Sequence, residues 1–209
     1  MKRLITTTAI LTTLVSTSAL AQGYQQDPNT GLYLGAGIGQ STLDNDTLDE
    51  LSDIGFNTDD SDTGYKLFVG YDFSPNFALE ASYLDFGDFT ADASVMDGSD
   101  TVTANIDASA DGFGFALLGR LPIAAGFGIH AKVGLLAWDG EVSGTVRENG
   151  TTTFQARGNA DGTDPFYGVG AEYVISRVMV RGEYERYDLS DSGEDFTIDL
   201  LSASVGYLF

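Results

Sequence analysis

The 209-residue sequence has no cysteine, one histidine, and ten basic residues against 31 acidic ones. The absence of cysteine excludes both a disulfide framework and thiol chemistry. The formal net charge of −21 excludes nucleic acid as a natural partner, because a phosphate backbone binds cationic surfaces. It also disfavours docking of the loops on anionic lipid headgroups, unless divalent cations bridge the two.

Long apolar runs are also missing. The most continuous one, Leu4–Val15, is rich in threonine and shorter than the roughly 20 residues of a membrane-spanning helix. It follows two basic residues and precedes Ala19-Leu20-Ala21, a pattern that predicts a secretory signal peptide over residues 1–21. Residues 22–209 are then expected to form one domain. If that domain spans a membrane, it must do so with strands.

The C-terminal segment 196–209 (FTIDLLSASVGYLF) alternates between apolar and small or polar residues up to its end. Its apolar side finishes with Val205, Tyr207 and Phe209. Soluble chains rarely end this way, because chain ends tend to fray, whereas the closing strand of a membrane barrel must alternate throughout. The pattern resembles the C-terminal assembly signal of bacterial outer-membrane β-barrels. That resemblance implies an outer-membrane location and recognition by the barrel-assembly machinery.

Alternation of apolar and polar residues recurs along the chain and predicts eight strands. The predicted ranges are 32–41, 65–73, 77–86, 113–121, 127–138, 166–175, 177–187 and 198–209. Three connections between them are short and four are long, and the third long one (140–164) is predicted to be a hairpin. The pattern predicts an all-β, eight-stranded antiparallel up-and-down transmembrane barrel with short periplasmic turns and long extracellular loops. A soluble eight-stranded barrel of the lipocalin type is the alternative, but it lacks this asymmetry.

The two faces of the predicted strands differ in chemistry. One face is apolar and free of charge, with aromatic residues near both ends, as expected of a band between two membrane interfaces. The other face carries glycines and a set of charged or titratable residues. This inward set comprises Lys66, Glu80, Arg120, His130, Lys132, Glu172, Arg181, Glu183 and Glu185. Because eight strands leave room only for side chains, and unpaired buried charges are costly, we predict a charge network that plugs the lumen.

From about residue 31 to residue 209, this layout resembles the transmembrane domain of the OmpA family. The stretches 62–71 (DTGYKLFVGY) and 76–80 (NFALE) look like the second and third strands of those proteins. The family's salt-bridge plug then falls on Glu80, Arg120, Glu172 and Arg181, with Lys132 as an extra partner. We expect Glu80 to pair with Arg120, and Glu172 to pair with Arg181 or Lys132. Larger family members add a peptidoglycan-binding domain, which we do not expect here.

The first long loop, 42–64, is strongly acidic and contains no basic residue. Carboxylates can bind Ca²⁺ or Mg²⁺, but Asp44-Asn45-Asp46 lacks the glycine and the distal glutamate of an EF-hand. A solvated surface is the favoured interpretation, and we expect no metal or cofactor. Within this loop, residues 47–50 (TLDE) fit a capping box and predict a short helix.

Catalytic motifs are scarce in this sequence. His130 occupies an inward position among charges, which is typical of a member of a polar network. The His-x-Ser-x-Asn pattern of barrel lipid A deacylases is absent, and so is G-x-S-x-G. We expect a non-enzymatic monomer in outer-membrane lipid, with a structural or surface-interaction role and with its acidic loops as the candidate surface for an extracellular ligand. The alternatives are a narrow pore for ions or small solutes and, less favoured, a lipid-modifying enzyme.

Overall fold

The computed structural model describes residues 31–44, 57–97, 100–191 and 194–209. Its strands are β1 (Gly31–Asp44), β2 (Asn57–Asp59), β3 (Ser61–Ser74), β4 (Phe77–Asp97), β5 (Asp100–Ala124), β6 (Phe127–Glu148), β7 (Thr151–Ile175), β8 (Val178–Asp191) and β9 (Glu194–Leu208). Within these ranges, no helix is long and apolar enough to cross a membrane. The predicted signal peptide and the predicted helix at 47–50 lie outside the described residues.

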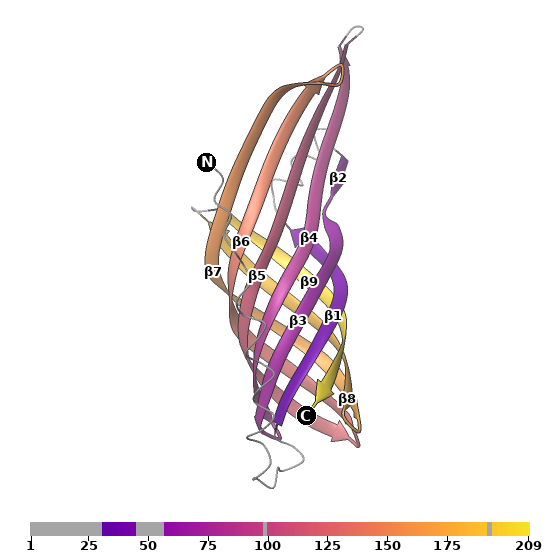
Figure 1. Cartoon of the computed structure of the whole chain (residues 1–209), viewed down its shortest axis with the longest axis vertical. Helices are drawn as coiled ribbons and strands as arrows, with labels where there is room; N and C mark the ends of the chain where they lie inside the picture. The colour runs from indigo at the N-terminus through magenta and orange to yellow at the C-terminus, as the bar shows by residue number, and fades with distance from the viewer. Residues whose placement is uncertain (1–30, 45–56, 98–99, 192–193) are drawn as a thin grey trace.

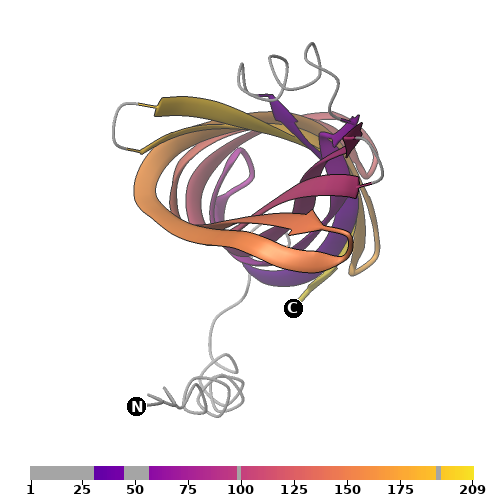
Figure 2. The same ribbon diagram turned by 90° about the horizontal axis from the view of Figure 1, so that it is seen from above.

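Eight of these strands form a closed antiparallel ring (Figures 1 and 2). Going round the ring, β4, β3, β1, β9, β8, β7, β6 and β5 are hydrogen-bonded neighbours, and β4 pairs with β5 to close it. The short strand β2 pairs only with β4, through Asn57–Asp59. The predicted eight-stranded antiparallel barrel is therefore confirmed.

The last strand completes the ring beside the first. Tyr207 lies opposite Leu34 of β1, and on its other side opposite Val178 of β8. The backbone N–H of Phe209 donates to the carbonyl of Leu32 at 2.9 Å. This end of the barrel, marked C in Figure 1, also carries the three short turns between β3 and β4, β5 and β6, and β7 and β8. One of these turns requires Gly126, whose φ of +78° favours glycine.

The outer surface of the ring carries the predicted apolar band. None of the side chains expected to face outward is buried, from Leu34 on β1 to Leu201 on β9. Aromatic side chains lie near both ends, for example Phe73 and Phe77 beside the short turns and Tyr167 toward the opposite end. Large apolar side chains that no other part of the chain covers are what a barrel needs when its outer face contacts lipid.

Two segments predicted as long loops are mostly strand. Strands β4 and β5 stay paired up to Asp97 and Asp100, and β6 and β7 up to Glu148 and Thr151. Four strands therefore rise beyond the ring, as the upper part of Figure 1 shows. We call residues 88–97, 100–111, 139–148 and 151–165 the β4–β7 extension. The hairpin predicted at 140–164 is present, and the longer loop predicted at 87–112 is a second hairpin.

A β-bulge joins the barrel part of β4 to its part of the extension. The register with β5 shifts between Asp85 and Asp88, and Gly87 takes a φ of +81°. One extra residue reverses which positions face inward, so that Phe86 and Phe89 are both buried inside. The backbone N–H of Asp88 donates to Asp62 at 2.7 Å, which holds the pKa of Asp62 below its usual value.

Candidate functional site

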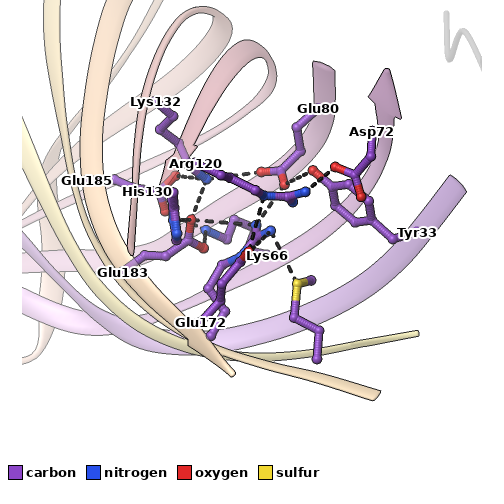
Figure 3. A network of polar contacts seen from close by, with 12 residues as sticks. Tyr33, Lys66, Asp72, Glu80, Arg120, His130, Lys132, Glu172, Glu183 and Glu185 are labelled. Carbon is purple, nitrogen blue, oxygen red and sulfur yellow. Dashed lines mark hydrogen bonds and ion pairs between the residues drawn. The ribbon is translucent and has the colours of Figure 1, made fainter. Parts of the chain in front are cut away.

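The side chains predicted to line the lumen meet inside the barrel (Figure 3). They come from six neighbouring strands, β3 to β8. Seven of the nine residues are buried, while Arg120 and Glu172 are half-buried. Period-two alternation places each of them on the inner face of its strand, and the tilt of the strands brings them together in space.

Two lysines and two glutamates form the centre of this cluster. Lys132 Nζ lies 2.6 Å from Glu183 Oε1 and 3.1 Å from Glu185 Oε1. Lys66 Nζ lies 2.7 Å from Glu183 Oε2 and 2.5 Å from Glu185 Oε2. Lys132 also reaches Glu80 Oε1 at 3.0 Å. Each carboxylate thus bridges two ammonium groups, an arrangement that compensates the cost of burying charge.

Arg181 links this centre to the end with the short turns. Its guanidinium lies 2.8 Å from Glu80 Oε2 and 3.3 Å from Glu172 Oε2. Its Cζ lies 5.6 Å from the centre of the Tyr33 ring and 5.2 Å from that of Phe68, within the range of cation–π attraction. The hydroxyl of Tyr33 donates to Glu80 Oε2 at 2.9 Å. Five side chains from five strands therefore hold one another in place.

His130 belongs to the same cluster. Its Nε2 lies 3.0 Å from Glu183 Oε1, and both side chains are fully enclosed, with 0% of their surface exposed. The ring therefore contacts an acid that is already paired with lysines and has no exposed surface to offer a substrate. This geometry is that of a network member rather than of an accessible general base.

The expected pair of Glu80 with Arg120 is wrong. Glu80 lies opposite Ala116 of β5, so Arg120 sits four residues farther toward the short turns, about 13 Å along the strand. Arg120 instead pairs with Asp72 and, at 3.3 Å, with Glu172. The predicted contact of Glu172 with Arg181 is present. The pairs that Arg120 forms with Asp72 and Glu172 border a cavity of about 350 Å³, which opens at the end with the short turns.

Sequence reasoning missed two members of the cluster, Tyr33 and Asp72. Both lie on inward positions by the alternation that located the others, so the signal was available. With Asp72 included, the described lumen holds five acidic residues. They are Asp72, Glu80, Glu172, Glu183 and Glu185, facing the cations Lys66, Arg120, Lys132 and Arg181.

An apolar layer lies above the charges, on the side away from the short turns. The ring of Tyr187 stacks on that of Phe166 and meets that of Phe86 edge-on, with a centroid distance of 4.9 Å in each case. Leu84 and Leu136 are fully buried beside them. A close-packed layer of this kind leaves little room for water.

Metal ligands are not grouped anywhere in the described ranges: no three His, Cys, Asp or Glu side chains are placed to hold an ion. Most of the acidic loop at 42–64 falls in residues 45–56, which are not described.

A closed eight-stranded ring with an apolar outer band and a polar, filled interior defines a β-barrel of the outer-membrane class. The sequence matches the model of the family described as the outer membrane protein beta-barrel domain over residues 7–209, and the chain belongs to that family. It is accordingly a protein of the bacterial outer membrane.

Solved structures with the same fold include those of Ail and NspA. The crystal structure of Ail, the attachment invasion locus protein of Yersinia pestis, superposes with a TM-score of 0.52 at 15% identity, covering 86% of this chain and 99% of that one. Neisserial surface protein A (NspA) superposes with a TM-score of 0.50 at 13% identity, covering 86% and 97%. At these identities the likeness concerns the fold alone. A sequence search of curated proteins found no match.

Proposed function

We propose that this protein is a closed, non-enzymatic barrel with a structural or surface-interaction role, in which the part outside the membrane makes the functional contacts. The observation that carries the proposal is the layer of ion pairs across the lumen. Its central side chains come from β3, β6 and β8, lie 2.5–3.1 Å apart, and are covered above by packed aromatic rings. These two layers support the proposal that the lumen is closed to a continuous path of water.

The absence of enzymatic activity is part of the proposal. It is supported by the enclosure of His130, whose Nε2 contacts Glu183 deep in the lumen. A general base must reach the proton that it abstracts, and this ring is walled in by its neighbours.

The partners that we propose follow from the outer surface. The exposed apolar band suits outer-membrane lipid, and its closure on itself suits a monomer, because no strand of the ring has a free edge. Val205, Tyr207 and Phe209 all face outward on the last strand and are exposed. We assign them to recognition by the barrel-assembly machinery during insertion.

The extracellular partner that suits this chain is not polyanionic. Ail has been crystallised with the heparin analogue sucrose octasulfate, an anion. Here the formal net charge is −21, and the outer face of the β4–β7 extension carries Asp92, Asp107 and Glu141. Repulsion between like charges disfavours a sulfated ligand, so a neutral or cationic surface is the expected partner.

A narrow pore for ions or small solutes is the second candidate. One observation favours it: the cavity of about 350 Å³ at the end with the short turns reaches Asp72, Arg120 and Glu172. Water could therefore enter from this end as far as the ion pairs of Arg120. Conduction would then require the pairs of Arg181 and Lys132 with Glu80 to open.

Single-channel conductance of the refolded mature chain (residues 22–209) in planar bilayers tests the proposal. Heat-modifiable gel mobility shows that the barrel has folded. We expect a silent barrel for the unaltered protein and for Arg186→Ala, which removes a partly exposed cation from the same strand as Arg181. Steady openings of the unaltered protein would instead support the pore, and Arg120→Ala and Arg181→Ala would then locate the gate.

A further inference from the structure

The β4–β7 extension has one apolar face and one polar face. On its inner side, which continues the lumen wall, β6 presents Val142, Gly144 and Val146. Their partners on β7 are Gly158, Ala156 and Phe154. The inner positions of β4 from 89 to 93 and of β5 from 102 to 110 carry only Phe, Ala, Val and Ile. No charged side chain stands at these positions.

A hollow of about 200 Å³ lies at the foot of this apolar face, at the mouth of the barrel. Its walls include Leu43, Phe89, Phe196 and Ile198, from three strands outside β5–β7. The space exists because the row of register partners Ala110, Gly140 and Ala160 is small. Larger side chains in this row would fill the hollow.

Trp138 forms the fixed wall of the hollow. Its side chain is almost entirely buried (2% exposed), and its indole N–H donates to Asp164 Oδ2 at 2.7 Å. Its ring meets that of Phe196 edge-on, with the centroids 5.3 Å apart. An aromatic wall that is held by both a hydrogen bond and ring packing is preformed, which lowers the cost of binding.

We propose that this hollow is a binding site for a neutral aromatic molecule of one or two rings. An apolar cavity of roughly 150 Å³ stays dry and takes up benzene, so the present volume suits a slightly larger ring system. The nearby Glu141 and Asp164 disfavour an anion. Above the hollow, Val142 and Phe154 leave 48% and 60% of their surfaces exposed, so the inner face is open to an apolar molecule approaching from outside.

The site is separate from the closure of the lumen. The layer of Phe86, Phe166 and Tyr187 lies between the hollow and the ion pairs, so binding requires neither conduction nor a change in the charge network. The two proposals can therefore fail independently.

The single tryptophan of the chain makes the test specific to this site. In ¹⁵N-labelled protein refolded into lipid nanodiscs, the indole N–H of Trp138 gives one cross-peak. Titration with 1-naphthol is expected to shift this cross-peak in a saturable way. The anion 1-naphthoate, with the same ring system, is expected to bind roughly tenfold or more weakly because of the neighbouring carboxylates.

Matched variants separate binding from partition into lipid. Ala108→Leu and Ala160→Leu each place a larger side chain in the hollow, and both are expected to abolish the shift while keeping heat-modifiable mobility. Asp107→Leu changes the residue next to Ala108, on the polar face of β5. This control variant is expected to retain the shift of the Trp138 cross-peak. An unaltered protein that shows no saturable shift, or a shift that persists in a folded Ala→Leu variant, would overturn the proposal.

Discussion

The barrel and the β4–β7 extension are made from the same strands with opposite chemistry. Along β6, the outward positions from Ile129 to Ala137 are apolar, and those from Asp139 to Arg147 are polar or charged. The inward positions change in the reverse sense, from His130 and Lys132 in the barrel to small and apolar residues in the extension. The side-chain alternation of β6 itself continues without a break.

Between Ala137 and Asp139, the surroundings of β6 change from lipid to water. An outer face in lipid must be apolar, whereas an outer face in water is better polar. The change occurs at a row of register partners that face outward, Asp85, Asp111, Asp139 and Asp161. This row lies directly above the aromatic residues Tyr83 and Phe113, which pair with each other. It therefore marks the outer boundary of the membrane.

The barrel is apolar outside and charged inside, and the extension is polar outside and apolar inside. We call this change an inversion, and it gives the two regions different roles. Charges in the barrel are locked in pairs, and under the proposed function they close the lumen and contribute to stability rather than to recognition. Apolar residues of the extension have no lipid to face and form the inner wall above the barrel mouth. Under the proposed function, the surface that binds a partner thus lies above the row of aspartates.

The largest effect is expected from breaking the ion cluster. Arg181→Ala leaves Glu80 and Glu172 short of a partner in an enclosed site. Removing one partner of a buried ion pair costs about 3–5 kcal/mol. Urea titration of the barrel in lipid vesicles should show this loss. Arg186→Ala on the same strand, at a partly exposed pair, should change the unfolding free energy by about 1 kcal/mol at most, and equal losses in the two variants would contradict the cluster's role.

Placing a charge on the outer face tests the boundary itself. Val133→Arg puts a cation near the middle of the apolar band of β6, where the cost is about 2–4 kcal/mol. Ser143→Arg, an outward position of the same strand above the boundary, should be nearly neutral. The unfolding free energies of the two variants in vesicles provide the measurement, and a costly Ser143→Arg would place the boundary higher.

Glycines in the two regions are expected to respond differently to a methyl group. A Cβ at Gly70 would overlap the ring of Tyr33, whereas a Cβ at Gly144 would meet nothing within 4 Å. Overpacking costs about 1–3 kcal/mol, so Gly70→Ala should destabilise the barrel and Gly144→Ala should not. Unfolding titrations of both variants would show this difference, and a tolerated Gly70→Ala would mean that the lumen is less tightly filled.

The smallest effect concerns the partly exposed pair of Arg186 and Asp199. Hydrogen bonds from Arg186 hold the pKa of Asp199 below its usual value. Because this pKa is lower in the folded state, the stabilisation is present above the ordinary carboxyl pKa of about 4 and is lost as the pH falls through the folded value. At this exposure the pair is worth about 1 kcal/mol or less. Asp199→Asn should therefore lose that amount at pH 7, and its difference in unfolding free energy from the unaltered protein should shrink as the pH falls below about 4.

Most of the barrel could be predicted from the sequence, because lipid imposes a strict period of two on its outer face. The ranges of the eight strands, the inward charged residues and the closing role of the last strand all follow from that period. Much of the extension falls in segments that the sequence predicts as long polar loops, and its composition is rich in threonine, alanine, glycine and aspartate. In the extension, apolar residues occupy the inward positions and polar residues the outward ones, which is the reverse of the barrel. The turn residues Asn149 and Gly150, both with positive φ, are a typical hairpin signal.

The partners of the ion pairs could not be predicted from single strands. Which acid meets which cation depends on the register between strands, as the wrong pairing of Glu80 with Arg120 shows. The bulge at Gly87 was missed for a related reason, because it becomes evident only when β4 is aligned with β5. Alternation fixes the face that a side chain occupies, whereas its neighbours depend on the stagger of the barrel.

The most direct test of the inversion is a spin-label accessibility scan along β6. Single cysteines at each position from 129 to 147 would carry the label, since the chain has no native cysteine. We predict that odd positions up to 137 are accessible to oxygen and protected from a water-soluble nickel complex, and that odd positions from 139 onward show the reverse. Odd positions that remain oxygen-accessible up to 147 would place the extension in lipid and contradict the boundary at Asp139.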